Sequence, residues 1–169
     1  MDYLKIILRM IHIFGGVFWV GTGLFSTFFL TPAINAAGDS GRQVLQLLMV
    51  RGRLAARISA AAGLTILAGI LLYWIDTDGF SSAWSRSGPG IGFGIGAAFG
   101  LLGFIFGFFV GQVNKALASL SSDLKGKPTP EQAAKLAGLK NSQSTNSLIS
   151  TVSLILATLF MAAARYFVF

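Results

Sequence analysis

Residues 87–114 read SGPGIGFGIGAAFGLLGFIFGFFVGQVN and carry no charged side chain. A helix needs about 20 apolar residues to cross a hydrocarbon core about 30 Å thick, because each residue rises about 1.5 Å. This stretch is therefore long enough to span a membrane. Its glycines recur every three or four residues and so share one edge of the helix. They are Gly92, Gly96, Gly100, Gly103, Gly107 and Gly111.

Such a row of small residues lets membrane helices approach closely, so the sequence predicts a helix-packing edge there. The alternative interpretation is a slot for a flat ligand such as a porphyrin or an isoprenoid tail.

Three other runs are also free of charge, namely residues 10–38, 58–75 and 141–164. Of the 169 residues, 11% are charged and 54% are hydrophobic, whereas roughly a quarter of the residues of a soluble domain carry charge. The sequence predicts one all-α membrane domain over residues 1–169, a bundle of four transmembrane helices. The expected spans cover residues 5–31, 54–75, 90–113 and 144–165.

The loops between the spans contain signals for short helices at the membrane surface. Pro32 predicts the end of the first span, because proline lacks the N–H that a helix needs. Ser40 is a candidate N-cap for an amphipathic helix over residues 44–48. In a later loop, residues 129–132 form a capping box with proline at the first helical position. An interfacial helix that enters the fourth span is expected there, with a solvated connector as the equal alternative.

Lysine and arginine predict the orientation. Nine of them lie in residues 33–57 and 114–140, and four lie on the opposite side. The expected location is a bacterial inner membrane. The positive-inside rule then places these two segments on its cytoplasmic side and both termini outside. Tyr73, Trp74 and Trp84 would form an aromatic belt at the outer face. Because the basic residues flank apolar spans, the net charge of +7 favours anionic lipid headgroups as partners and not nucleic acid.

The residue inventory excludes several kinds of chemistry. The chain has no cysteine and one histidine, His12, so disulfides, thiolate metal sites and catalytic triads are excluded. No charged residue lies deep in a predicted span, which disfavours proton-coupled transport. The polar residues from Asn146 to Ser153 are expected to bond neighbouring helices. Asp76 and Asp78 are expected to pair with Arg86 or to solvate the outer turn.

His12 is the one histidine of the chain and lies inside the first predicted span, and an intramembrane histidine is a functional candidate. Gly16 and Trp19 continue its face of the helix, where the glycine would leave space for a planar ligand. Arg9, one turn toward the outside, would meet the carboxylates of that ligand. Met161 is expected at a similar depth as a second axial ligand. The pattern predicts b-type haem or copper, and the alternative is a neutral histidine bonded to a serine or carbonyl of another helix.

Residues 12–32, which begin HIFGGVFWVG, resemble the first helix of a set of small four-helix membrane proteins. The set includes the copper-resistance D-like family, uncharacterised relatives and the haem-containing bacterial protoporphyrinogen oxidases. Weaker likeness extends to Arg53, residues 69–74 and residues 161–166.

The resemblance implies a four-helix inner-membrane fold, and His12 matches the helix-one histidine that ligates haem in the oxidase branch. That branch also has further histidines and a lysine near the start of its third helix, where this chain has GIGF at residues 90–93. The copper branch is expected to have more histidine or methionine ligands than this chain. The resemblance therefore carries the fold and not the oxidase activity.

The sequence thus predicts a small, non-enzymatic or accessory membrane protein that binds haem or copper through His12. Two alternatives remain. One is a small ion or solute permease related to copper uptake. The other is a packing subunit of a larger membrane complex or a homo-oligomer, held together through the glycine edge.

Overall fold

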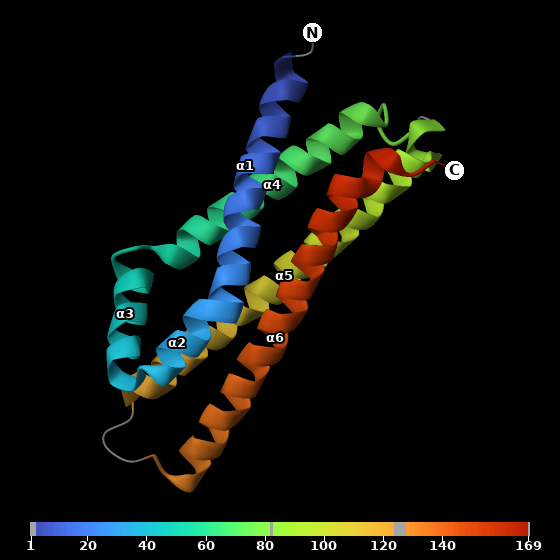
Figure 1. Ribbon diagram of the computed structural model, residues 1–169. Helices are drawn as coiled ribbons and strands as arrows, with labels where there is room; N and C mark the ends of the chain where they lie inside the picture. The colour runs from blue at the N-terminus through green and yellow to red at the C-terminus, as the bar shows by residue number, and fades with distance from the viewer. Residues whose placement is uncertain (1–2, 82, 124–127, 169) are drawn as a thin grey trace.

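A computed structural model describes residues 3–81, 83–123 and 128–168. Four of its helices are long and apolar enough to cross a membrane, as Figure 1 shows. They are α1 (Tyr3–Phe25, continued to Ala36), α4 (Leu54–Asp76), α5 (Gly88–Asp123) and α6 (Pro130–Ala163). The prediction of an all-α membrane fold with four spans is confirmed.

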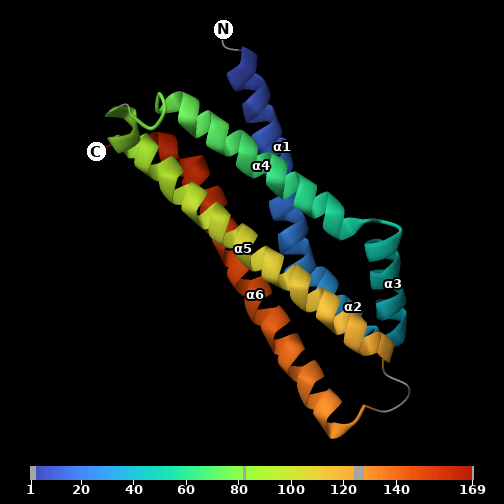
Figure 2. The same ribbon diagram turned by 180° about the vertical axis from the view of Figure 1, so that it is seen from behind.

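The four spans form two pairs. Helix α1 packs chiefly on α4, and α5 packs chiefly on α6, which Figure 2 shows from behind. The π-helical turn that follows α1, Ser26–Leu30, joins the pairs: Thr27 Oγ1 lies 2.8 Å from Thr151 Oγ1 of α6. The start of α1 and the end of α6 lie at the same end of the molecule (Figure 1), as an even number of spans requires.

The first helix does not end at Pro32, so that prediction is wrong. Helix α1 passes directly into a π-helical turn, Ser26–Leu30, and then into α2 (Thr31–Ala36). The Thr31 N–H donates to the carbonyl of Ser26, five residues earlier. Proline removes one donor and crowds the carbonyl four residues before it. A wider turn immediately before the proline accommodates both effects, and the helix continues.

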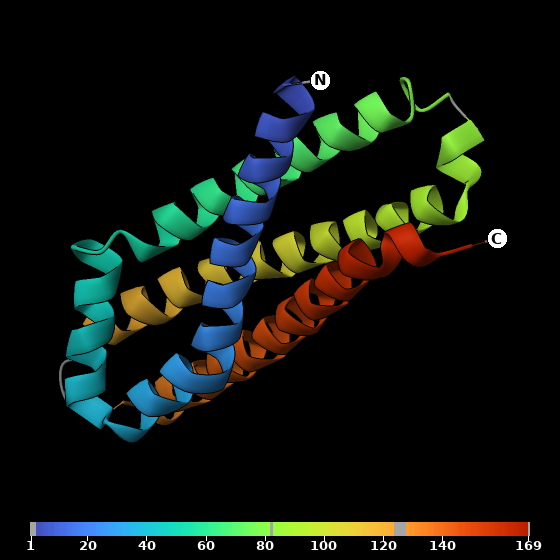
Figure 3. The ribbon, with the colours of Figure 1, turned by 45° about the horizontal axis from the view of Figure 1, so that its top comes forward.

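The predicted amphipathic segment of the first loop is a helix, α3 (Gly38–Val50). It connects the end of α2 to the start of α4 and runs across that end of the bundle (Figure 3). Ser40 lies inside α3 and does not cap it: the N-cap position is Ala37, and no side chain bonds there. Gly38, with φ of +58°, makes the turn between the two helices.

The capping box at the start of α6 is present. The Gln132 N–H donates to Thr129 Oγ1 at 3.3 Å, and the Thr129 N–H donates to Gln132 Oε1 at 2.9 Å. From Pro130 the helix continues without a break to Ala163, so the expected interfacial segment and the fourth span are one element. Gln143 Nε2 donates to Asn114 Oδ1 at 2.5 Å and ties this extension to α5.

Candidate functional site

His12 lies half-buried in the contact between α1 and α4. Its ring rests on bare backbone of α4, since a Cβ at Gly69 would lie 2.7 Å from His12 Cε1. His12 Nδ1 is 2.8 Å from the carbonyl oxygen of Thr65. A carbonyl oxygen accepts hydrogen bonds and cannot donate, so Nδ1 carries the hydrogen. In the neutral ring Nε2 then has a free lone pair, and within the described part of the chain no hydrogen bond reaches it.

Thr65 occupies the space beside the glycines that follow His12. A Cβ at Gly15 would lie 2.5 Å from Thr65 Oγ1 and 3.3 Å from the carbonyl of Ala61, and a Cβ at Gly16 would lie 3.6 Å from Thr65 Cγ2. The hydroxyl of Thr65 donates back to the Ala61 carbonyl at 2.8 Å. The sequence predicted that these glycines leave room for a planar ligand. In the structure they allow α4 to pack closely against α1.

Two further predicted site residues have different surroundings. Trp19 is buried, packs with Ala62 and Leu154, and meets the ring of Phe104 edge-on with centroids 6.2 Å apart. It therefore connects the two helix pairs. Arg9 is exposed on α1, one turn before His12, and no ion pair is found for it among the described side chains.

Met161 belongs to the other helix pair. A Cβ at Gly96 of α5 would lie 3.1 Å from Met161 Cγ, so the methionine fills the contact between α5 and α6. His12 lies between α1 and α4, and the two residues therefore do not form one site. Within the described ranges, no group of three or more His, Asp or Glu side chains could hold a metal ion.

The glycine edge of α5 faces α6 and the residues after it. A Cβ at Gly103 would lie 2.7 Å from Leu154 Cδ2, and Ser150 Oγ donates to the Gly103 carbonyl at 2.7 Å. At Gly111 a Cβ would have no neighbour within 4 Å. Neighbours within that distance also occur at Gly92, Gly96, Gly100 and Gly107. Helix α6 therefore occupies the face where the alternative interpretation placed a flat ligand.

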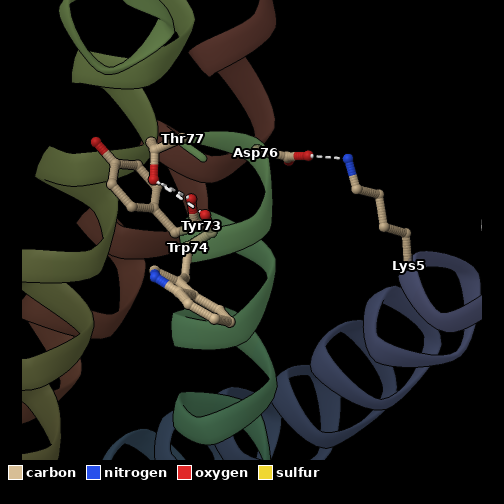
Figure 4. Close-up of polar contacts among 5 residues, drawn as sticks. All are labelled: Lys5, Tyr73, Trp74, Asp76 and Thr77. Carbon is tan, nitrogen blue, oxygen red and sulfur yellow. Dashed lines mark hydrogen bonds and ion pairs between the residues drawn. The ribbon is translucent and has the colours of Figure 1, made fainter. Parts of the chain in front are cut away.

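The turn after α4 is held by contacts that the sequence did not predict (Figure 4). Asp76 Oδ1 pairs with Lys5 Nζ of α1 at 2.9 Å and not with Arg86 as expected, because this carboxylate faces α1. Both side chains are about one-third exposed, so the pair contributes at most about 1 kcal/mol. Thr77 is fully buried, and its hydroxyl donates to the Tyr73 carbonyl at 2.7 Å.

The predicted aromatic belt divides into two parts. Tyr73 donates through its hydroxyl to the Gly90 carbonyl at 3.1 Å, and its ring lies 5.9 Å from that of Trp84. These two residues fasten the end of α4 to the start of α5. Trp74 is half-exposed and can contact the membrane–water interface.

No family model, no curated protein and no solved structure matches this chain. The fold itself defines the class: a small polytopic membrane protein built from two helix pairs. The resemblance of the first span to the copper-resistance D-like set stays a prediction that rests on residues 12–32.

Proposed function

We propose that this protein binds b-type haem through Nε2 of His12. The hydrogen bond between His12 Nδ1 and the Thr65 carbonyl, at 2.8 Å, supports the proposal. Metal-bound histidines almost always donate their other ring N–H to a carbonyl, a carboxylate or water, which sets the tautomer and the ring orientation. The main chain of α4 makes that bond here, and Nε2 is the nitrogen left to bind a metal.

Haem is favoured over copper by the number of ligands required. A copper site draws on several nitrogen or sulfur ligands, and the chain has one histidine and no cysteine. Haem iron can be held by a single axial histidine. Arg9, exposed one turn away, is available to a propionate. Bound haem would supply one-electron transfer or binding of a small gas, depending on its axial ligands.

The proposal differs from the sequence prediction in its second ligand. Met161 lies against Gly96 in the other helix pair, so it has no place in the proposed haem site. His12 is the single protein ligand proposed.

Protein purified from its native membrane is expected to show a Soret band and reduced-minus-oxidised α and β bands. His12→Ala should abolish these bands, because it removes the ligating nitrogen. Met161→Leu should leave their position unchanged, because the replacement alters only the contact with Gly96. Absorption spectra of the three proteins, with circular dichroism as a check of folding, make the measurement. A colourless protein that also takes up no haem on reconstitution would reject the proposal.

The orientation in the membrane is the second part of the proposal: both termini face outward. The Lys and Arg tally of the sequence supports the outward direction, and the start of α1 and the end of α6 on one side of the bundle (Figure 1) support a shared side for the two termini. A reporter that is active only in the cytoplasm, fused after Phe169, is expected to give no signal, while the same reporter in the loop between α5 and α6 should be active. The reverse pattern would show that both termini face the cytoplasm.

A role as a packing subunit is the second candidate, and the exposed face of α1 is the surface on which a partner helix would pack. Five side chains on this face each expose more than half of their surface. They follow the four- and three-residue spacing on which a second helix packs. These residues are Tyr3, Ile7, Met10, Phe14 and Val17. This candidate predicts a colourless protein, so the same spectra distinguish it from haem binding.

A further inference from the structure

We propose that the corner between α3 and α4 binds the headgroup of an anionic phospholipid. The corner is a tight turn between Val50, where α3 ends, and Leu54, where α4 begins. A Cβ at Gly52 would lie 2.5 Å from the Leu48 carbonyl, so only glycine fits there without a shift. Arg53 follows in the left-handed region, with φ of +46°.

Three arginine side chains lie at this corner and in the first turn of α4. Arg51, Arg53 and Arg57 are all exposed, and within the described part of the chain none of them forms an ion pair. Arg57 is the last charged residue before the run 58–75, so the three lie where the hydrocarbon core of the membrane begins. The corner thus carries concentrated positive charge at headgroup depth.

The exposed face of α3 lies next to the corner, and Arg51 belongs to both. Gln43, Gln46, Leu47, Val50 and Arg51 line an open hollow along the helix. Leu47 and Val50 each expose more than half of their surface. The hollow therefore combines amide donors, one guanidinium and two aliphatic side chains. An amphipathic helix with such a face lies at the boundary between headgroups and acyl chains.

An anionic phospholipid matches each part of this surface. Guanidinium groups bind phosphate oxygens through paired N–H donors, and the amides can donate to the ester or hydroxyl oxygens below the phosphate. Leu47 and Val50 can contact the first carbons of the acyl chains. A zwitterionic headgroup carries a positive charge of its own, which the three arginines repel. This inference does not depend on haem binding.

The test uses the full chain in detergent, mixed with equal amounts of phosphatidylglycerol and phosphatidylcholine that have the same acyl chains. Native mass spectrometry is expected to show that the protein retains phosphatidylglycerol several-fold more often than phosphatidylcholine. The double variant Arg51→Gln, Arg53→Asn should lose most of this preference. Asparagine is chosen at position 53 because it tolerates the left-handed conformation. Arg86→Gln, which removes an exposed arginine at the opposite end, is the matched control and should keep the preference.

Three outcomes would overturn the inference. They are equal retention of the two lipids, an equal loss in the Arg86→Gln control, and release of the bound lipid by millimolar inorganic phosphate, which would indicate a phosphate site.

A second measurement avoids the double variant, in case that variant fails to fold. The chain has no cysteine, so Leu47→Cys provides a single position for a nitroxide label. Phosphatidylglycerol should slow the label more than phosphatidylcholine does, and equal mobility would count against the site.

Discussion

Gly103→Leu is expected to lower the melting temperature of the protein in detergent by several degrees. A Cβ at this position would lie 2.7 Å from Leu154 Cδ2 and 3.3 Å from the Ser150 carbonyl. Leu154 is almost fully buried and packs with Trp19 and Ala62, so it has little room to move away. Overpacking of this kind typically costs about 1 to 3 kcal/mol, and separating α5 from α6 also stretches the bond from Ser150 Oγ to the Gly103 carbonyl.

Gly111→Leu is the matched control, because it is the same substitution on the same helix at a position with no neighbour within 4 Å. Leucine favours a helix over glycine by up to about 1 kcal/mol, so this variant should melt at the same temperature or higher. Gly100, whose Cβ would approach only Ala157 Cβ at 4.0 Å, should give an intermediate result. Thermal unfolding followed by circular dichroism makes the comparison. Equal melting of the Gly103 and Gly111 variants would mean that α5 and α6 do not meet along this edge.

Gly15→Leu is expected to have a comparable effect on the other helix pair. A Cβ there would lie 2.5 Å from Thr65 Oγ1 and 3.3 Å from the carbonyl of Ala61, and a main-chain carbonyl cannot rotate away as a side chain can. Helix α1 must then move off α4, which breaks the bond between His12 Nδ1 and the Thr65 carbonyl. The expected loss of stability is again about 1 to 3 kcal/mol or more, measured in protein without cofactor.

Gly21→Leu is the control for this pair, since a Cβ at Gly21 meets nothing within 4 Å. If haem is bound, Gly15→Leu should also weaken the Soret band, whereas Gly21→Leu should leave it intact. A Gly15→Leu variant as stable as the Gly21→Leu variant would contradict the contact between α1 and α4.

The spans could be predicted because charge in hydrocarbon is costly, so long charge-free runs are visible in the sequence. The continuation of the first helix through Pro32 could not be predicted in this way. The rule that proline ends a helix considers one residue and its neighbours, and a change to five-residue hydrogen bonding over Ser26–Leu30 removes the conflict.

The candidate site was harder to predict, because periodicity shows that a helix edge is bare but not what covers it. The adjacent Gly15 and Gly16 and the regularly spaced glycines of α5 both mark a bare helix edge, and α4 covers the first edge while α6 covers the second. Equal depth along two spans likewise did not reveal that Met161 faces α5. The partner of Asp76 is Lys5, 71 residues away, and proximity in sequence had suggested Arg86.

The pairing of helices has a consequence for biosynthesis. Helices α1 and α4 can pair before α5 and α6 have been made, because each pair is built from one continuous half of the chain. At about 5 to 20 residues per second, the ribosome needs several seconds more to complete α6. During that interval Thr151, the hydrogen-bond partner of the Thr27 hydroxyl, has not yet been synthesised. Defects in the first pair are thus exposed to insertion factors and membrane proteases while the second pair is still being synthesised.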